Sequence, residues 1–457
     1  MSTQRQSSQE ILCIQVGGCG NQVGEVFWDQ LRQEYGIDNT GTIVDTSSIS
    51  SELLENIEVF FKKTSDGKYL PRTINVDLDP ATLDSLRASS ISKLLLTDNY
   101  FFSTEGTNNN WAKGFYTKGA ELINEIMAGV KKELDACANP QGVILFHSLG
   151  GGTGSGLGSL ILSKIKTMNP DLCCVTYSVF PSPKVSDVVV EPYNATLTIH
   201  QLSKHADLVF VIDAGAIFSM MHFVLKNKNP KSSDFSWTIA NIIRDSTSPL
   251  RLGYKPWVLR DIVAQMVSYP GFNFVIFGGA PIYPEEAIGK LNVRINEIAV
   301  QAISDINNMT GTDFVNGKIL NSRLIIRGNT TDLEVYQERE RIKSRLDSEL
   351  AQWIPNNFGT SHLSTPTTHS KISGIFIANS TAIKSLFQRI SEHFHEMYSR
   401  KAFLHWYKGE GMHQMELEAA NVTVLNLISK YEEVEKIVIE NQGSGPGSGT
   451  GSPEEEE

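Results

Sequence analysis

Short apolar runs that end in glycine alternate with stretches of helical spacing in the first part of the chain. Residues 11–16 are mostly apolar and lead directly into the glycine-rich segment 17–20. A run this short, stopped by glycine, is typical of a buried strand. Beyond it, apolar residues recur at helical spacing, at Val23, Val26, Phe27 and Leu31.

The same order of strand, glycine turn and helix returns later in the chain. Residues 143–146 have the strand pattern, 150–156 are rich in glycine, and 157–165 again show helical spacing. Residues 123–134, between the two units, are predicted to form an amphipathic helix. Further strands are predicted at 173–180 and 208–212.

Strands that alternate with helices predict a mostly parallel sheet covered by helices on both faces. We therefore predict an α/β, Rossmann-like nucleotide-binding domain over residues 11–213. The next region, 214–380, mixes strand candidates with helical stretches and is predicted to be an α+β domain. Its strand candidates are 274–277, 324–326 and 375–377.

Residues 381–441 are predicted to form a helical hairpin whose helices meet near 409–411. The first apolar stripe consists of Ile383, Leu386, Phe387, Ile390, Phe394 and Met397. The second consists of Met415, Val422, Leu425, Ile428 and Tyr431.

Both ends of the chain lack such patterns. Residues 1–10 are polar and are predicted to be a disordered extension. Residues 442–457 contain mainly Gly, Ser and Pro and end in four glutamates, a composition that cannot bury enough apolar surface to fold. A run of four glutamates of this kind is consistent with a solubilising charge run.

Length and composition narrow the class of protein. A chain of 457 residues with 40% apolar residues can form two or three domains with a sizeable core. Its net charge of −11 argues against sequence-independent binding of nucleic acid or anionic membrane. Neither a membrane span nor a secretory signal is expected from the hydropathy pattern. Five cysteines without CxxC or Cys/His spacing indicate reduced thiols rather than a zinc site.

The strongest chemical signal is the segment GGGTGSG at 150–156, between a predicted strand and a predicted helix. Glycines allow backbone N–H groups to approach an anion closely, and the following helix adds the positive end of its dipole. The alternative is a flexible linker or a tight turn. A P-loop is excluded because Leu157 stands where that motif needs lysine, and neither glycine cluster has the GxGxxG spacing of dinucleotide-binding folds.

A second glycine cluster, at 17–22, also follows a predicted strand. Alone it would be as consistent with a plain turn. Two such loops at the carboxyl ends of parallel strands lie at the edge where open α/β sheets bind ligands. The two clusters together therefore predict a site for a nucleotide triphosphate.

Other polar residues could complete such a site, because neither glycine loop contains lysine. Asp77 and Asp79 are suited to Mg²⁺, although a turn or a helix cap before Pro80 is the alternative. The loop 106–110 could supply N–H and amide donors, or could be an ordinary surface loop. Asp187 and Glu191 could accept hydrogen bonds from ribose hydroxyls, with a structural role equally open.

Several longer segments are similar to the tubulin family, and those from residue 181 onward are closest in wording to the β type. They are GGCGNQVG at 17–24, NNWAKGFYTKGAEL at 109–122, HSLGGGTGSGLGSLILSKI at 147–165, PSPKVSDVVVEPYNATLTIHQL at 181–202, WIPNN at 353–357, NSTAI at 379–383 and KAFLHWYKGEGM at 401–412. The resemblance implies a GTPase domain, an intermediate domain and a carboxyl-terminal helical pair. It also implies head-to-tail assembly, in which a neighbouring subunit completes the hydrolytic site.

The resemblance assigns roles to individual positions. It implies bound GTP or GDP and Mg²⁺, with ribose contacts from Asp187 and Glu191 and a magnesium-linked carboxylate at Asp79, supported by Asp77. The implied contacts around the phosphates are Gly18, Cys19, Gln22, Asn109, Ser148, Gly151, Gly152, Thr153 and Gly154.

Departures from the family pattern concern the base and the phosphates. Gly18 stands where the family has a glutamine that reaches toward phosphate and magnesium. The positions that normally read and stack on guanine are Ala214, Ser232 and Ser236 here. Loss of these contacts is expected to weaken base recognition, by roughly 1 kcal/mol or more for each. Phe235 or Trp237 could restore stacking.

Further departures concern the contacts with neighbouring subunits. In the loop 253–258, Pro256 and Val258 replace two polar groups of the family pattern. Asp261 aligns with the family's catalytic acid and could act on a neighbour's nucleotide, or could belong to a solvated helix face. Lys290 occupies the position of the aromatic or histidine key of lateral contacts, which makes ordinary sidewise packing doubtful.

Two functions follow from these patterns. The first is a GTP-binding structural subunit of cytoplasmic microtubules or basal bodies, polymerising with another tubulin, α-tubulin-like in type, and with at most slow GTPase activity. Its acidic tail would bind motors or modifying enzymes. The alternative is a nucleotide-degenerate relative that caps or decorates microtubules. A nicotinamide-dependent dehydrogenase is disfavoured, since no GxGxxG with a downstream acid is present.

Overall fold

The computed structural model describes residues 9–44, 49–253, 256–287 and 293–443. The predicted amino-terminal extension and acidic tail lie almost entirely outside these ranges, as do Lys290 and the first half of the 253–258 loop.

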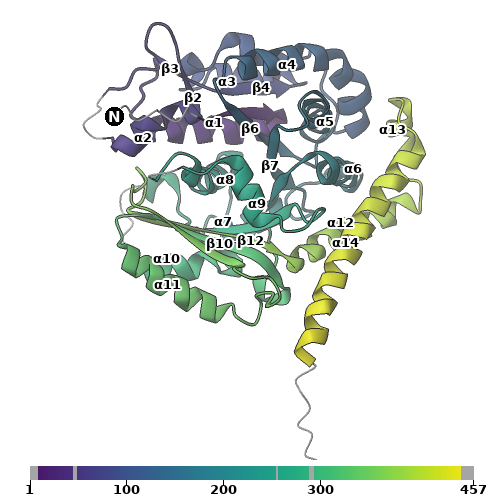
Figure 1. The fold of residues 1–457 in the computed structure, drawn as a ribbon. Coiled ribbons are helices and arrows are strands. Elements are labelled where there is room, and N and C mark those ends of the chain that lie inside the picture. Colours follow the sequence, from purple (N-terminus) through teal and green to yellow (C-terminus); the bar gives the residue numbers. More distant parts are fainter. Residues whose placement is uncertain (1–8, 45–48, 254–255, 288–292, 444–457) are drawn as a thin grey trace, which may run out of the picture.

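One ten-stranded sheet forms the centre of the molecule, with the strand order β11-β10-β12-β9-β8-β7-β6-β1-β4-β5 (Figure 1). The strands from β5 to β8, which belong to the amino-terminal half of the chain, all pair in parallel. They are β5 (Tyr100–Phe102), β4 (Thr73–Asp77), β1 (Glu10–Val16), β6 (Pro140–Ser148), β7 (Cys173–Phe180) and β8 (Leu208–Asp213). The predicted parallel sheet of an α/β domain is therefore confirmed.

The sheet continues into the second half of the chain. β9 (Phe274–Ala280) pairs in parallel with β8, so that the strands cross the predicted boundary at residue 213 without a break. The remaining strands, β12 (Ile372–Ser380), β10 (Ile319–Gly328) and β11 (Phe358–Leu363), add antiparallel pairs between β9 and β12 and between β12 and β10. A separate hairpin consists of β2 (Phe61–Lys63) and β3 (Tyr69–Pro71).

Helices cover both faces of the sheet. One face packs against α4 (Lys118–Asp135), α5 (Gly158–Met168), α6 (Glu191–His205), α10 (Ile295–Ala302) and α11 (Asp332–Arg345). The other packs against α1 (Gly17–Glu34), α3 (Pro80–Arg87), α7 (Ala214–Phe223), α8 (Ser232–Ser246) and α9 (Leu259–Met266). Shorter elements are α2 (Ser51–Glu55), two π-helical turns (Lys113–Thr117, Thr153–Leu157) and 3₁₀ turns at Ile57–Val59, Ser92–Leu94, Thr97–Asn99, Ser248–Leu250, Glu285–Ala287, Asp305–Asn307, Phe314–Asn316 and Thr381–Ile383.

Alternation along the strands explains the two-sided core. In β1, Leu12, Ile14 and Val16 point into one hydrophobic cluster, whereas Ile11 and Cys13 point into the other. A strand buried on both faces has a nearly continuous apolar sequence, which is why residues 11–16 carry no polar alternation. The central strands are thus fixed between two helical layers, and their carboxyl ends form a rigid edge.

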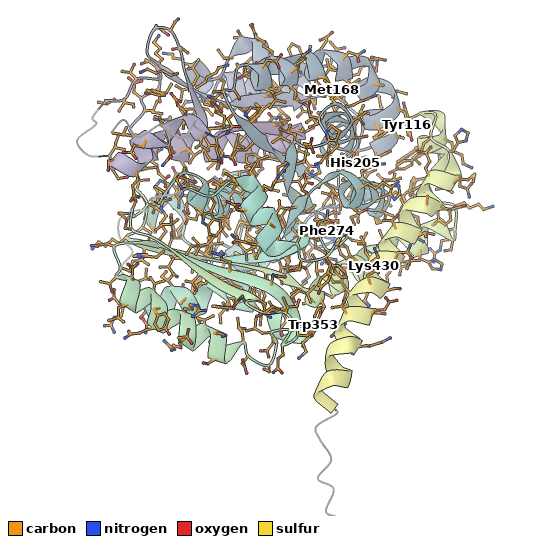
Figure 2. The ribbon with its side chains drawn as sticks, in the orientation of Figure 1. Tyr116, Met168, His205, Phe274, Trp353 and Lys430 are labelled. Atoms are coloured by element: carbon orange, nitrogen blue, oxygen red, sulfur yellow. The ribbon has the colours of Figure 1, made fainter. Side chains whose placement is uncertain are left out.

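The carboxyl-terminal helices run along one side of both halves of the sheet (Figure 1). α12 (Lys384–Tyr398) and α14 (Gln414–Gly443) pack against each other and against α6, with the short α13 (Leu404–Gly409) between them. Phe274 lies in the sheet (Figure 2). Its ring meets that of Phe387 in α12 edge to face at 5.1 Å between ring centroids. The predicted helical pair is confirmed, with α13 as an element that the spacing did not indicate.

The second apolar stripe was predicted wrongly. Ile428 and Tyr431 are buried, but Met415, Val422 and Leu425 lie on the outer surface of α14. The face that packs inward carries Leu417, Ala420, Val424, Leu427, Ile428 and Tyr431. Apolar residues occur on two faces of this helix, and only the packing against α6 and α12 decides which face is buried.

Within the described ranges, no helix combines the length and the apolar character that crossing a membrane requires.

Candidate functional site

The two glycine clusters meet at the carboxyl edge of the parallel strands. Gly17 follows β1 directly, and Gly154 lies in the turn after β6, the neighbouring strand. A β-carbon built on Gly17 would lie 2.9 Å from the backbone nitrogen of Gly154, and Gly17 also has a φ of +76°. Only glycine satisfies both conditions at this position. The sequence prediction that these loops converge is therefore met by direct backbone contact.

The loop 106–110 joins them. A β-carbon on Gly152 would lie 2.4 Å from Oγ1 of Thr107, and Oδ1 of Asn109 is 3.8 Å from the corresponding point on Gly151. Asn109 itself has a φ of +57°, a left-handed conformation that costs energy in a residue other than glycine. Three loops that are far apart in the sequence thus line one space, and backbone rather than side chains forms most of its wall.

The two helical segments that follow the glycine clusters leave their first N–H groups without side-chain caps. α1 begins at Gly17 with no capping hydrogen bond and no acidic residue in its first turn. The π-helical turn Thr153–Leu157, which leads into α5, has the same features. By contrast, Asp213 caps α7 by accepting from the N–H of Gly215. Uncapped helix starts without nearby carboxylates favour an anion, such as phosphate.

The residues that the sequence places around the phosphates differ in solvent exposure. Gly18, Cys19, Ser148 and Gly151 are half-buried at the edge, and Asn109 and Gln22 are exposed. Burial raises the pKa of the Cys19 thiol to about 11, so the thiol is neutral at physiological pH. Gln22 accepts a hydrogen bond from the hydroxyl of Ser232 at 2.8 Å, which links α1 to the start of α8.

The two candidate magnesium carboxylates differ in environment. Asp79 is exposed and caps α3 by accepting from the N–H of Ala81 at 3.1 Å, so the capping alternative is realised. Asp77 is 2% exposed; its Oδ1 accepts from the N–H of Asp79, and its Oδ2 has no hydrogen-bond partner.

Burial raises the pKa of Asp77 to about 6, partly offset by hydrogen bonds from the backbone N–H of Asp79 and from the side chain of Thr82. A buried carboxylate with one unpartnered oxygen fits a cation or its bound water. Among the described residues, no group of three or more His, Cys, Asp or Glu side chains is arranged to bind a metal. A cation at Asp77 would therefore need ligands from water or from the nucleotide.

Asp187 and Glu191 lie beside the glycine turn. Glu191 is the first residue of α6, and its Oε1 is 2.7 Å from the point where Gly150 would carry a β-carbon. Burial raises the pKa of Glu191, with an opposing hydrogen bond from Ser186. Both carboxylates line a cavity of about 400 Å³ between the 181–192 segment and α12. Their predicted contact with ribose stays a prediction.

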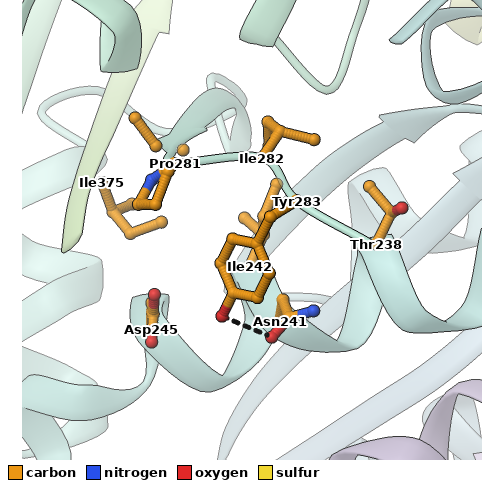
Figure 3. Close-up of a pocket in the computed structure, with 10 residues that line it drawn as sticks. Thr238, Asn241, Ile242, Asp245, Pro281, Ile282, Tyr283 and Ile375 are labelled. Carbon is orange, nitrogen blue, oxygen red and sulfur yellow. Dashed lines mark hydrogen bonds between the residues drawn. The ribbon is translucent and has the colours of Figure 1, made fainter. Parts of the chain in front are cut away.

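The residues around the expected base position are small, and one proposed substitute is engaged elsewhere. The ring of Trp237 stacks on His369 at 5.5 Å, and its Nε1 donates to the carbonyl of Tyr283 at 3.2 Å. One face of the indole and its N–H are therefore engaged within the fold, and stacking of Trp237 on a base stays a prediction. Figure 3 shows the neighbouring pocket, where the hydroxyl of Tyr283 donates to Oδ1 of Asn241. Phe235 is half-buried against the core.

Asp261 lies at the opposite edge of the sheet. Its helix, α9, is held by Gln141 and Asp171, residues at the amino ends of β6 and β7. Asp261 is exposed, and its carboxylate accepts from the N–H of Val258 at 3.3 Å, in the first turn of the helix. No nucleotide on the same chain can be reached from there, because β6 separates the two edges by roughly 23 Å at about 3.3 Å per residue.

Three buried polar residues support the loops and were not predicted from the sequence. Nδ2 of Asn21 donates to the carbonyls of Gly17 and Val76, which ties the first glycine turn to β4. Nδ1 of His147 contacts the carbonyl of Gly154 at 2.8 Å, and burial lowers the pKa of His147 to about 4. The third is Asn194 of α6. Their only sequence signal is a polar residue inside an apolar element.

Two protein-family models match this chain, one in its amino-terminal half and one in its carboxyl-terminal half. Residues 10–222 match the family model described as Tubulin/FtsZ family, GTPase domain, and residues 270–392 match the one described as Tubulin C-terminal domain. Together they cover well over half of the 457 residues. The first range contains all three loops. The stretch between them, 223–269, contains α8, the 253–258 loop and Asp261, where the sequence also departs from the tubulin pattern.

Proposed function

Because the chain belongs to the tubulin family, we propose that it is a GTP-binding structural subunit that assembles head to tail with another tubulin in microtubules. The family implies the binding of GTP or GDP and association with other tubulin subunits. The proposal extends this to a lattice, to an α-tubulin-like partner and to slow GTP turnover completed by a neighbour.

The observation that carries the proposal is the backbone contact between Gly17 and Gly154, with Thr107 packed against Gly152. Gly17, Gly152 and Gly154 contribute no side chain of their own where the three loops approach each other. Backbone N–H groups at two uncapped helix starts can then surround a polyphosphate without lysine. This fit explains why five glycines occupy 150–156.

The fit to Mg²⁺ rests on Asp77. Its unpartnered buried Oδ2 lies at the end of β4, next to the loop from β1. Asp79 would assist from the cap of α3. Mg²⁺, when bound, would neutralise phosphate charge that no lysine of the glycine loops offsets.

The opposite positions of the two edges support head-to-tail assembly. The nucleotide loops follow the carboxyl ends of β1 and β6, whereas Asp261 stands beside the amino ends of β6 and β7. An acid at one end can act on a nucleotide at the other end only when a second subunit follows in line. From the family membership we also propose a cytoplasmic, microtubule-associated location, with the acidic tail 442–457 as a binding site for motors or modifying enzymes.

The first test is the identity of the bound nucleotide. Protein purified in Mg²⁺ is denatured, and the released nucleotides are separated by chromatography; we expect about one guanine nucleotide for each chain. A preparation that stays free of nucleotide after incubation with saturating GTP and Mg²⁺ would contradict the proposal. Release of adenine nucleotides instead would show that the phosphate site is used without guanine selectivity.

A second function, capping or decoration of microtubules without appreciable turnover, is favoured by the loop before α9. Pro256 and Val258 offer no polar side chain there, and the carboxylate of Asp261 is engaged by the N–H of Val258. Sedimentation separates the two functions. Self-assembly of the pure protein supports the first, whereas binding to preformed microtubules without self-assembly supports the second.

A further inference from the structure

Asn194 lies at the point where the phosphate-side loops meet the carboxyl-terminal helices. It is fully buried in the first half of α6. Its Nδ2 donates to the carbonyls of Asn109 and Gly150, each at 2.7 Å. Its Oδ1 accepts from the N–H of Trp111 at 3.1 Å and from the hydroxyl of Tyr407, on α13, at 2.7 Å.

The partners determine the orientation of this amide. Two carbonyl oxygens can only accept, and the N–H of Trp111 can only donate, so Nδ2 must face the carbonyls and Oδ1 must face Trp111. The hydroxyl of Tyr407 therefore donates to Oδ1. Both donor hydrogens and both acceptor positions of Asn194 are then used, which leaves the side chain a single arrangement.

That arrangement sets the direction of a peptide group in the glycine turn. In a trans peptide the C=O and the following N–H point in opposite directions. Because Asn194 holds the carbonyl of Gly150 toward α6, the N–H of Gly151 points away from α6, to the open side of the turn. The bond to the carbonyl of Asn109 likewise holds that residue in its left-handed conformation.

Two further bonds hold α13 and the residue that follows it to the segment 110–117. Nδ2 of Asn110 donates to the carbonyl of Trp406 at 3.1 Å, and the hydroxyl of Thr117 donates to Glu410 at 2.6 Å. Trp406 is 47% exposed, while Tyr407 is fully buried against the ring of Tyr193, which in turn contacts Phe394. One face of α13 is thus open to solvent, and the other is bonded to the phosphate-side loops.

We propose that Asn194 is a positioning residue for the bound nucleotide, and that the hydroxyl of Tyr407 sets its orientation, so that the docking of α13 and the retention of nucleotide are coupled. The inference rests on the proposed function, because it concerns the same nucleotide site. The coupling is reciprocal: whatever loosens α13 releases nucleotide, and nucleotide in turn holds α13.

Tyr407→Phe tests this, with Tyr193→Phe as the matched control. Both tyrosines are buried in the same aromatic cluster. The hydroxyl of Tyr407 donates to Asn194 at 2.7 Å, with the carbonyl of Val190 farther away at 3.5 Å, whereas the hydroxyl of Tyr193 donates to the carbonyl of Ala402 and not to Asn194. Both variants are full-length and keep the aromatic ring. We expect Tyr407→Phe to speed the dissociation of a fluorescent GTP analogue about threefold to tenfold, and Tyr193→Phe to leave it within about twofold.

Hydrogen exchange supplies a measurement that a general loss of stability would not reproduce. In wild type, added GTP should slow amide exchange at 404–409 as well as at 107–112 and 150–152. In Tyr407→Phe the effect of GTP on 404–409 should disappear, and in Tyr193→Phe it should persist. Equal dissociation rates for wild type and Tyr407→Phe, or equal changes in both variants, would overturn the inference.

Nucleotide binding by the wild-type protein distinguishes failure of the proposed function from failure of this inference alone. If wild type binds no guanine nucleotide, the proposed function fails and the inference fails with it. If wild type binds GTP and only the Tyr407→Phe effect is missing, the inference alone fails.

Discussion

Gly151 differs from the other glycines of its turn in what surrounds it. A β-carbon on Gly152 would overlap Thr107, and one on Gly154 would lie 2.9 Å from the carbonyl oxygen of Ser148. On Gly151 it would meet nothing nearer than Oδ1 of Asn109 at 3.8 Å. The fold can therefore accept alanine at 151, but the methyl group enters the space that the three loops line.

This contrast predicts a variant that folds but binds nucleotide poorly. Gly151→Ala should change the free energy of unfolding by less than about 0.5 kcal/mol. It should weaken GTP binding at least tenfold, about 1.4 kcal/mol, since the methyl group blocks the approach to backbone N–H groups. Titration calorimetry measures the affinity. Equal affinities in wild type and Gly151→Ala would contradict the assignment.

The buried charge of Asp77 is expected to lower the stability of the nucleotide-free protein and to support the binding of Mg²⁺ with GTP. Its folded pKa of about 6 exceeds the ordinary value of 3.8, so the folded state binds more protons between these values, and stability falls as pH rises through this window. Asp77→Asn should therefore stabilise the nucleotide-free protein at pH 7.5 by about 1–3 kcal/mol. Thermal unfolding at pH 4 and pH 7.5 checks the sign, because the gain should shrink at the lower pH.

The same substitution should reduce magnesium-dependent GTP affinity. A cation ligand must be ionised, so wild-type affinity should also fall as the pH drops below about 6. Asp77→Asn should abolish that pH dependence. Retention of full magnesium dependence in the variant would exclude Asp77 from the metal site.

At the residue scale, the sequence indicated the glycine positions and Asp77 but not their supports. Glycine spacing after a strand is a local signal, whereas Asn194 gains its role only when α6 packs beside residues 109 and 150. The closeness of Trp237 in sequence to the start of α8 indicated stacking on the base, but not that the helix would direct one face of the ring toward His369.

Among the elements, α8 joins the nucleotide edge to the second half of the sheet. Its first residue, Ser232, bonds to Gln22, and near its other end Arg244 enters a buried ionic cluster. In this cluster Glu34 of α1 contacts Arg251 at 2.8 Å and Arg327 of β10 at 2.9 Å. The helix α8 therefore joins a polar contact at the nucleotide edge to a buried ionic cluster that includes a residue of β10.

Removal of the Glu34 charge should be severely destabilising. Burial alone would raise the pKa of Glu34, but the guanidinium groups of Arg327, Arg251 and Arg244 hold it at about 2. Burial also lowers the pKa of Arg327, against the effect of Glu34, yet a guanidinium stays protonated throughout this range. Glu34→Gln leaves buried cations uncompensated and should cost about 3–5 kcal/mol by denaturant unfolding.

Asp84→Asn, which breaks the exposed pair with Arg87, is the control and should cost less than about 1 kcal/mol. The folded pKa of Glu34 is below its ordinary 4.5, so its contribution is present above that pH and is lost as the pH falls toward 2. Similar losses in both variants would show that the buried cluster is no more important than a surface pair.

Long strands buried on both faces were easier to predict from the sequence than short strands or helices with apolar residues on two sides. β1, β6, β7 and β8 were recognisable because burial on both sides makes a strand apolar throughout. β4 was missed because its five residues, TINVD, include buried polar side chains. The face of α14 was misassigned because apolar residues occur on both of its sides, and only tertiary packing selects one.

For the whole molecule, the separation of Asp261 from the glycine loops predicts a change seen only in assemblies. Asp261→Asn should leave the GTP affinity of the free subunit within about twofold, because the substitution lies at the other end of β6. If a neighbour's nucleotide is its target, GTP turnover in the assembled state should fall about tenfold or more. Phosphate release, measured above and below the assembly concentration, distinguishes this from a plain helix-capping role.

The overall division of the chain was accessible from its sequence, but the continuity of the sheet was not. Apolar strands at 208–212 and 274–277 were both predicted, yet nothing local indicated that β8 and β9 would pair across the intervening helices. Pairing between distant segments depends on the packing of α7, α8 and α9 against one face, which no short pattern encodes.

If the chain assembles head to tail as proposed, the loop before α9 affects the growth of the filament. A subunit whose two ends differ can join a filament at its nucleotide edge and still present a poor surface for the next addition, because Pro256 and Val258 lack the polar groups of the family pattern. Incorporation of such a subunit would then terminate elongation in one direction only. A small molar fraction of this protein would shorten filaments of ordinary tubulin from a single end, and it would do so without lowering the amount of tubulin available to assemble.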